Sequence, residues 1–160
     1  MGGLEYAQSI GAFAIGLSCN RESKIATRSD ICITPVVGPE IVSGSTRMKA
    51  GTATKMVLNM LTTGAMIRLG KTCGNLMVDL RATNTKLADR ARRIVRAVTN
   101  LTENESERLL KDSGGEVKTA IVRHYTGYSP IEARQLLSAS HGHLKTALKG
   151  HLVNNNASAH

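Results

Sequence analysis

Two short apolar runs near the start of the chain alternate with helical patterns. Residues 13–17 and 31–37 predict buried strands, and residues 4–12 and 22–27 predict short helices. Strands that alternate with helices indicate a parallel α/β sheet, whose strands are apolar because both faces are covered. Two strands do not complete such a sheet. We therefore expect the chain to begin inside a domain, with the earlier strands missing.

A longer helix is predicted between a small-residue loop and Gly70. Residues 43–46 form a loop of the kind that opens helices, and Ser45 or Thr46 is the expected cap. The apolar residues that follow, as far as Leu69, cover a broad face of the helix. We expect this helix to be largely buried. Gly70 is expected to end it.

The next stretch is predicted to be a connector followed by an amphipathic helix. Residues 74–80 carry an extended pattern, and Thr83 or Asn84 is placed to cap the helix that follows. That helix has a one-sided apolar stripe that includes Ala91 and Val95. Its charged residues are expected to face water.

Three short helices are predicted after residue 105. They span residues 106–112, 116–125 and 130–148, with Ser129 as the cap of the third and a break near Gly142. This pattern is typical of a small three-helix bundle that packs on a neighbouring domain. The predicted division is 1–70 for the α/β part, 71–104 for a helical connector, 105–150 for the bundle, and 151–160 for a disordered tail.

Composition and charge narrow the choice of function. Aromatic residues are 2% of the chain and the formal net charge is +9. The basic residues are spread along the chain and are densest in residues 81–96, on the helix face that is expected to be solvated. Few aromatic rings are available to stack on bases, so we expect no nucleic-acid partner. An acidic small molecule remains compatible with the charge.

The cysteines and the apolar runs indicate the compartment. Cys19, Cys32 and Cys73 are widely spaced without a CxxC pair, which fits a reducing cytosol and predicts no metal site. The apolar runs are too short for a membrane span, and the start of the chain has no signal-peptide pattern. We therefore expect a cytoplasmic protein with no membrane partner.

The segment 38–55 carries the candidate chemistry. It follows the carboxyl end of a predicted parallel strand, where open α/β sheets bind ligands, and it leads into a helix N-terminus, which favours anions. Arg47 and Lys49 oppose the helix dipole there, by ~0.3–1 kcal/mol each. Glu40 is either a carboxylate partner for this region or a ligand of sugar hydroxyls. The remaining alternative is a capped helix with two solvated cations.

The same segment resembles a signature of the N-acetylmuramic acid 6-phosphate etherases, which is shared with the glucokinase regulatory protein. The string Gly38-Pro39-Glu40-Ile41-Val42-Ser43-Gly44-Ser45-Thr46-Arg47-Met48-Lys49-Ala50-Gly51-Thr52-Ala53-Thr54-Lys55 carries it. The likeness continues through residues 56–71, 74–79 and 82–87, and upstream it includes residues 6–12 and 18–20. The final helices resemble the small C-terminal bundle of the etherases.

The resemblance implies a sugar isomerase (SIS) domain and cleavage of a lactyl ether by elimination and hydration, without metal or organic cofactor. The family's acid and base glutamates and its phosphate-binding serine loop lie before the start of this chain, so its catalytic residues stay unassigned. The full-length parent is implied to be a cytoplasmic homodimer of amino-sugar catabolism and peptidoglycan recycling. The implied contacts to the sugar phosphate are Glu40, Ser43, Ser45, Thr46, Arg47 and Lys49.

Other functions compete with this reading. A non-catalytic sugar-phosphate-binding regulator, of the glucokinase regulatory protein type, is the main alternative. A nucleic-acid-binding fragment and a poorly folding remnant are the others. Replacement catalytic groups are not expected, because the glutamates of residues 103–116 sit where helix capping uses them. His141 and His143 diverge on a helix, so no metal site is expected there.

Overall fold

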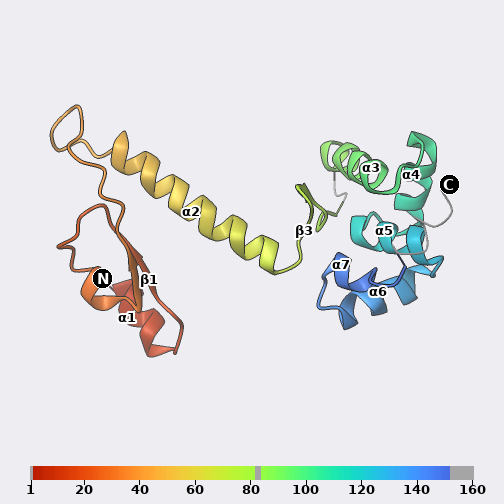
Figure 1. The fold of residues 1–160 in the computed structure, drawn as a ribbon, viewed down its shortest axis with the longest axis horizontal. Coiled ribbons are helices and arrows are strands. Elements are labelled where there is room, and N and C mark those ends of the chain that lie inside the picture. Colours follow the sequence, from red (N-terminus) through yellow and green to blue (C-terminus); the bar gives the residue numbers. More distant parts are fainter. Residues whose placement is uncertain (1, 82–83, 152–160) are drawn as a thin grey trace. The chain divides into compact units, whose positions relative to one another are not determined.

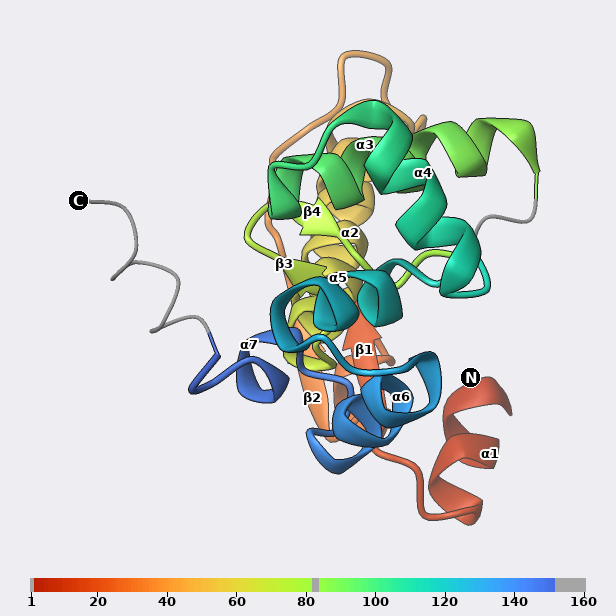
Figure 2. The same cartoon turned by 90° about the vertical axis from the view of Figure 1, so that its right-hand side faces the viewer.

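The computed structural model describes residues 2–81 and 84–151, which form two compact units divided between Thr63 and Gly64. Figures 1 and 2 show the elements of each unit. Helices and a small parallel sheet are both present, as expected for an α/β chain. The predicted segment boundaries at residues 70 and 104 stay predictions. The predicted tail falls, after His151, outside the described residues.

The first unit contains the parallel pair of strands. Helix α1 (Gly2–Ser9) precedes strand β1 (Ile15–Leu17), and the short 3-10 helix η1 (Ala26–Arg28) precedes strand β2 (Ile31–Ile33). The two strands pair in parallel, with Gly16 opposite Cys32. Gly16 is required by close packing, because a Cβ there would lie 2.5 Å from Ile25 Cγ2. The predicted strands are confirmed in type and pairing, although both are shorter than predicted.

Helix α2 (Lys49–Arg68) departs from two expectations. It has no buried residue, whereas the apolar pattern predicted a largely buried helix. The prediction is wrong for this chain because burial needs neighbouring elements, and the described contacts of α2, such as the one from Cys19, leave all its residues at least partly exposed. The helix also begins at Lys49, later than a cap at Ser45 or Thr46 requires.

The second unit opens with a hairpin and a capped helix. Strands β3 (Thr72–Cys73) and β4 (Leu76–Met77) pair in antiparallel fashion where a connector was predicted. Helix α3 (Thr85–Thr99) follows, and the Asn84 side chain accepts a hydrogen bond from the Leu87 backbone N–H at 2.9 Å. Asn84 is therefore the cap. The alternative cap, Thr83, lies outside the described residues.

The remaining helices match the predicted pattern closely. They are α4 (Glu103–Asp112), α5 (Val117–Thr126), α6 (Pro130–Ala139) and α7 (Leu144–Ala147). Ser129 caps α6 as expected, in a reciprocal capping box with Glu132. The break near Gly142 is confirmed, since α6 and α7 are separate helices.

One apolar core holds the second unit together. Val95 of α3, together with Val117 and Ile121 of α5, is fully buried in it, and α4, α6 and α7 contribute further residues. The Tyr125 hydroxyl donates to the Val98 carbonyl oxygen at 2.6 Å, which ties α5 to α3. Helix α3 thus shares its core with the bundle.

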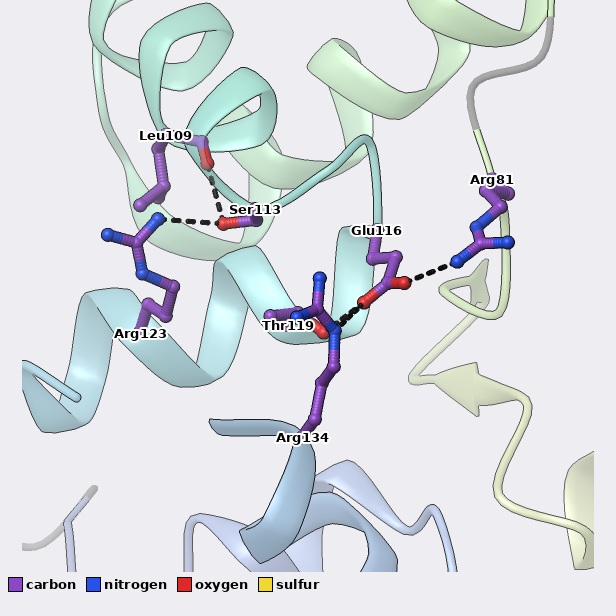
Figure 3. Close-up of polar contacts among 7 residues, drawn as sticks. All are labelled: Arg81, Leu109, Ser113, Glu116, Thr119, Arg123 and Arg134. Carbon is purple, nitrogen blue, oxygen red and sulfur yellow. Dashed lines mark hydrogen bonds and ion pairs between the residues drawn. The ribbon is translucent and has the colours of Figure 1, made fainter. Parts of the chain in front are cut away.

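A polar network closes this core around Glu116 (Figure 3). The Glu116 carboxylate accepts hydrogen bonds from Arg81 at 2.6 Å, Arg134 at 2.7 Å and the Thr119 hydroxyl at 2.9 Å. Burial raises the pKa of Glu116, but the hydrogen bonds from Arg134, Arg81 and Thr119 outweigh it and lower the pKa to about 2. The carboxylate therefore joins the segment before α3 to α5 and α6.

No described helix combines the length and the apolar character needed to cross a lipid bilayer.

Candidate functional site

An open cavity of about 540 Å³ lies in the first unit, beside the carboxyl ends of β1 and β2. Leu17 at the end of β1 and the turn of residues 18–20 line one side of the cavity. Residues 37–40, a few positions after β2, also line it, together with Thr46 and the first two turns of α2. Parallel strands end at one edge of a sheet, and ligands of open α/β folds bind at that edge. Its lining residues are Leu17, Ser18, Cys19, Asn20, Val37, Gly38, Glu40, Thr46, Ala50, Gly51 and Thr54.

Glu40 connects the loop to the start of α2. Its carboxylate accepts the backbone N–H of Lys49 at 3.1 Å and that of Ala50 at 3.0 Å. These hydrogen bonds, the one from Ala50 foremost, lower the pKa of Glu40 below its ordinary value of 4.5. Glu40 is thus the carboxylate partner of the helix start, through backbone amides instead of cationic side chains. It replaces the predicted cap at Ser45 or Thr46.

The two cations of the loop bind within the loop itself. The Lys49 ammonium donates to the Pro39 carbonyl oxygen at 2.9 Å. The Arg47 guanidinium donates to the Ser45 hydroxyl at 3.0 Å. Both side chains lie on exposed residues, so either contact can be exchanged for an anionic ligand at small cost.

The structure brings together only part of the predicted set of contacts. Glu40 and Thr46 line the cavity. Ser43, Ser45, Arg47 and Lys49 belong to the same loop and helix start but do not line it. The role of each as a ligand contact stays a prediction.

Nine of the eleven lining residues were not singled out as contacts from the sequence, among them four with polar side chains. Ser18, Cys19 and Asn20 were interpreted as a turn, and Thr54 as part of a helix. The Cys19 thiol lies 3.9 Å from the Thr54 hydroxyl, which places the turn against α2. The position of the turn, directly after β1, was the available signal, since strand ends build such sites.

The cavity offers neutral polar groups and one carboxylate. Hydroxyl and amide groups of Ser18, Asn20, Thr46 and Thr54 are of the type that pairs with sugar hydroxyls. Glu40 is the sole carboxylate among the lining residues. Across residues 2–81 and 84–151, no three histidine, cysteine or acidic side chains are grouped to hold a metal ion.

No protein-family model matches the chain. Comparison with curated proteins, in contrast, gives relatives that all carry the same name. Three curated relatives are each named N-acetylmuramic acid 6-phosphate etherase. The Rhodopirellula baltica protein is 64% identical over 121 residues, which are 76% of this chain and 40% of the relative. The Clostridium botulinum protein is 57% identical, with the same two shares.

The third relative, from Brucella anthropi, is 60% identical over 76% of this chain and 39% of its own length. The chain therefore spans about two fifths of the length of the relatives that it matches. Identity at this level over three quarters of a chain reflects common ancestry. By sequence, this chain is a relative of the N-acetylmuramic acid 6-phosphate etherases and matches the C-terminal portion of that family.

Proposed function

We propose that this chain forms part of the sugar-phosphate site of an N-acetylmuramic acid 6-phosphate etherase. The supporting observation is the cavity lined with hydroxyl and amide groups at the strand ends, in a chain 57–64% identical to etherases over 76% of its length. A sugar ring needs neutral hydrogen-bonding groups of this kind. Arg47 and Lys49, on the adjoining loop, attract an anionic substrate. A complete etherase is proposed to be a homodimer built on an SIS fold.

The reaction proposed for the complete enzyme breaks the ether bond at C3 of the ring-opened sugar. A base removes the proton at C2, which is acidified by the C1 aldehyde, while an acid protonates the departing ether oxygen of D-lactate. Water then adds to the unsaturated aldehyde to give N-acetylglucosamine 6-phosphate. Two groups with different protonation states are required.

The described part of the chain supports binding more than proton transfer. Glu40 is the single carboxylate of the cavity, and two backbone amides hold it as an anion. Its lowered pKa makes it a weak base, and its protonated form is too scarce near neutral pH for it to be the acid. The acid and base are therefore assigned to another part of a complete etherase.

The same observation favours a second candidate, a non-catalytic sugar-phosphate-binding regulator. A cavity with binding groups and one stabilised carboxylate meets the needs of a sensor that carries out no chemistry. The two candidates differ in one property, since only the etherase releases D-lactate once its missing groups are supplied.

The test measures binding and turnover separately. Binding of N-acetylglucosamine 6-phosphate is followed by NMR, and D-lactate release from N-acetylmuramic acid 6-phosphate is followed by an enzymatic assay. We expect the chain alone to bind, with shifts at residues 18–20 and 46, and to release no D-lactate. Thr54→Val should weaken binding roughly 3- to 10-fold by removing one hydroxyl.

Thr52→Val is the matched control, because Thr52 is exposed on the same helix and does not line the cavity. If Thr54→Val and Thr52→Val weakened binding equally, the cavity would not be the binding site and the proposal would be wrong on this point. Turnover by the chain alone would contradict the assignment of the acid and base, and Glu40→Gln would then be the first variant to assay.

A further inference from the structure

Two adjoining cavities lie in the second unit, where α3 ends and α4 begins. The larger has a volume of about 760 Å³ and is lined by residues 93, 96–97 and 100–103. The smaller, of about 390 Å³, is lined by Asp89, Arg92, Arg93, Arg96, Glu103 and Ser106. Arg93, Arg96 and Glu103 line both cavities, so the two form one continuous site.

Arg93 and Arg96 supply positive charge to both cavities. They are exposed and lie three positions apart on α3, which places their side chains on the same face of the helix. Neither guanidinium group has a hydrogen bond or an ion pair to a residue that the structure describes. The acidic side chains of the site contact Arg92 instead, since its guanidinium group pairs with Asp89 and, at 3.4 Å, with Glu103. Two cations are therefore left to bind an anion.

The start of α4 adds backbone donors to the larger cavity. Thr102 caps this helix, and its hydroxyl accepts the Glu105 backbone N–H at 3.4 Å. The backbone N–H groups of Glu103 and Asn104, in the same first turn, have no acceptor among the described residues. Such groups and the helix dipole favour an anion. Because Thr102 and Glu103 line the larger cavity together with the two arginines, both kinds of donor border the same space.

Ser106 is a second indication of a ligand, independent of the arginines. It is fully buried, and its hydroxyl has no hydrogen-bond partner among the described residues. A buried hydroxyl without a partner destabilises the fold, and such groups are uncommon in native proteins. Ser106 lines the smaller cavity together with Arg93 and Arg96. A ligand oxygen in this cavity would give the hydroxyl its acceptor.

These donors fit a phosphate group better than a carboxylate. Each guanidinium group offers a planar set of N–H donors, and two such groups with helix amides match the several oxygens of a phosphate. The volumes of about 390 and 760 Å³ fall within the range of small-molecule sites, ~300–1,000 Å³. A nucleic acid fits less well, because no aromatic ring that could stack on a base is among the described lining residues.

We propose that the junction of α3 and α4 binds a small phosphorylated compound. Arg93 and Arg96 hold the phosphate at the first turn of α4, and the Ser106 hydroxyl donates to the ligand from the smaller cavity. This site belongs to the second unit, whereas the cavity that contains Glu40 belongs to the first. The proposal therefore does not depend on the proposed etherase function.

The test is an NMR titration of the full chain with inorganic phosphate, at an ionic strength held constant with sodium chloride. We expect saturable shifts of the backbone amides of Glu103 and Asn104. The side-chain Nε–H groups of Arg93 and Arg96 should shift over the same range of concentration. Acetate should need a concentration at least about tenfold higher for half-saturation, because it offers only two oxygens to these donors.

Paired variants of α3 locate the site. Arg93→Gln with Arg96→Gln should weaken phosphate binding roughly tenfold or more, through loss of charge-assisted hydrogen bonds. Lys86→Gln with Arg90→Gln is the matched control, because it removes two positive charges from exposed residues of the same helix that line neither cavity. The control should change the affinity by less than about twofold, since exposed charges at a distance are screened by salt.

Ser106→Ala distinguishes a ligand contact from a purely structural role. Removing a buried hydroxyl that has no partner should leave the free chain as stable as before, or more stable, in urea unfolding. The affinity for phosphate should nevertheless fall roughly 3- to 10-fold, because the ligand loses one donor.

Several results would overturn the proposal. They are a titration without saturation, an equal loss of affinity in the two paired variants of α3, and an unchanged affinity in Ser106→Ala. Shifts at residues 18–20 and 46 with none at residues 93–106 would place phosphate in the first unit and would also contradict it. Tighter binding of a short single-stranded RNA, weakened by both paired variants and steeply by salt, would identify a nucleic-acid surface along α3 instead.

Discussion

Glu40 shows how one residue acquires its role at the scale of single contacts. Its place after a predicted strand marked it as a candidate, and two alternatives remained open for it. The structure shows the contact with the helix start, since Glu40 accepts the amides of Lys49 and Ala50 across nine or ten positions of chain. Its role as a ligand of sugar hydroxyls stays a prediction. Sequence patterns for helix caps involve only residues within about three positions of the helix start. They therefore cannot predict a cap that a more distant residue supplies through the fold of a loop.

Glu116 gives a prediction about pH at the same scale. Its pKa of about 2 lies below the ordinary 4.5, so its stabilisation is fully present above about pH 4.5 and is lost as the pH falls toward 2. Glu116→Gln should lower the free energy of unfolding at pH 7 by roughly 1–2 kcal/mol, after allowance for solvent screening of the exposed arginines. Urea unfolding at pH 7 and at pH 2.5 measures it.

The difference between wild type and Glu116→Gln should shrink at pH 2.5, where the carboxylate is partly protonated. Asp112→Asn is the matched control, because it removes one negative charge at an exposed residue for which the structure gives no ion pair among the described residues. A control variant that loses as much stability would show that net charge, and not the network of Figure 3, is responsible.

At the scale of elements, helix ends were predictable where the signal is local. Ser129 with Pro130 starts α6, and glycine-rich breaks separate the later helices, as predicted. The start of α2 was misplaced because Ser45 and Thr46 have the right side chains but the capping group is distant. Strand lengths were overestimated because an apolar run shows which residues favour a sheet, and pairing partners decide how far it extends.

The end of α2 supplies a prediction about an element boundary. Gly70 has a φ of 67°, and a Cβ there would lie 2.8 Å from the His143 ring. Gly70→Ala should therefore lower the free energy of unfolding by roughly 1–3 kcal/mol through backbone strain and displacement of His143. Thermal unfolding followed by circular dichroism measures the change.

Gly64→Ala is the matched control within α2. A Cβ at Gly64 meets no atom within 4 Å, so alanine there should be neutral or stabilising by up to about 1 kcal/mol. If both substitutions stabilised the chain equally, the contact between Gly70 and His143 would not constrain the end of the helix.

At the scale of the whole molecule, the two units differ in the interactions that stabilise them. The second unit has a shared core that includes Val95 and Ile121, both fully buried. The first has a strand pair, an exposed α2 and very few buried residues. Stability is set by buried apolar area and by backbone hydrogen bonds protected from water. The two units should therefore not open together.

Hydrogen exchange of the chain alone tests this difference. The amides of Val95 and Ile121 should exchange slowest, and those of Gly16 and Cys32 should exchange faster by on the order of 100-fold or more, because local opening of the strand pair exposes little apolar surface. Uniform exchange rates across both units would contradict the prediction and would indicate one cooperative structure.

The sequence by itself determined the family relationship, most of the element types, and the caps and breaks formed by neighbouring residues. The family relationship is read directly from the order of the residues. Local caps and breaks depend on hydrogen bonds between residues that are adjacent or nearly so in the chain. Tertiary structure decided the capping role of Glu40, the contribution of Cys19 and Thr54 to the cavity, and the exposure of α2. Those features depend on which distant segments contact one another. An apolar pattern indicates that a segment favours burial, but it does not identify the segment that buries it.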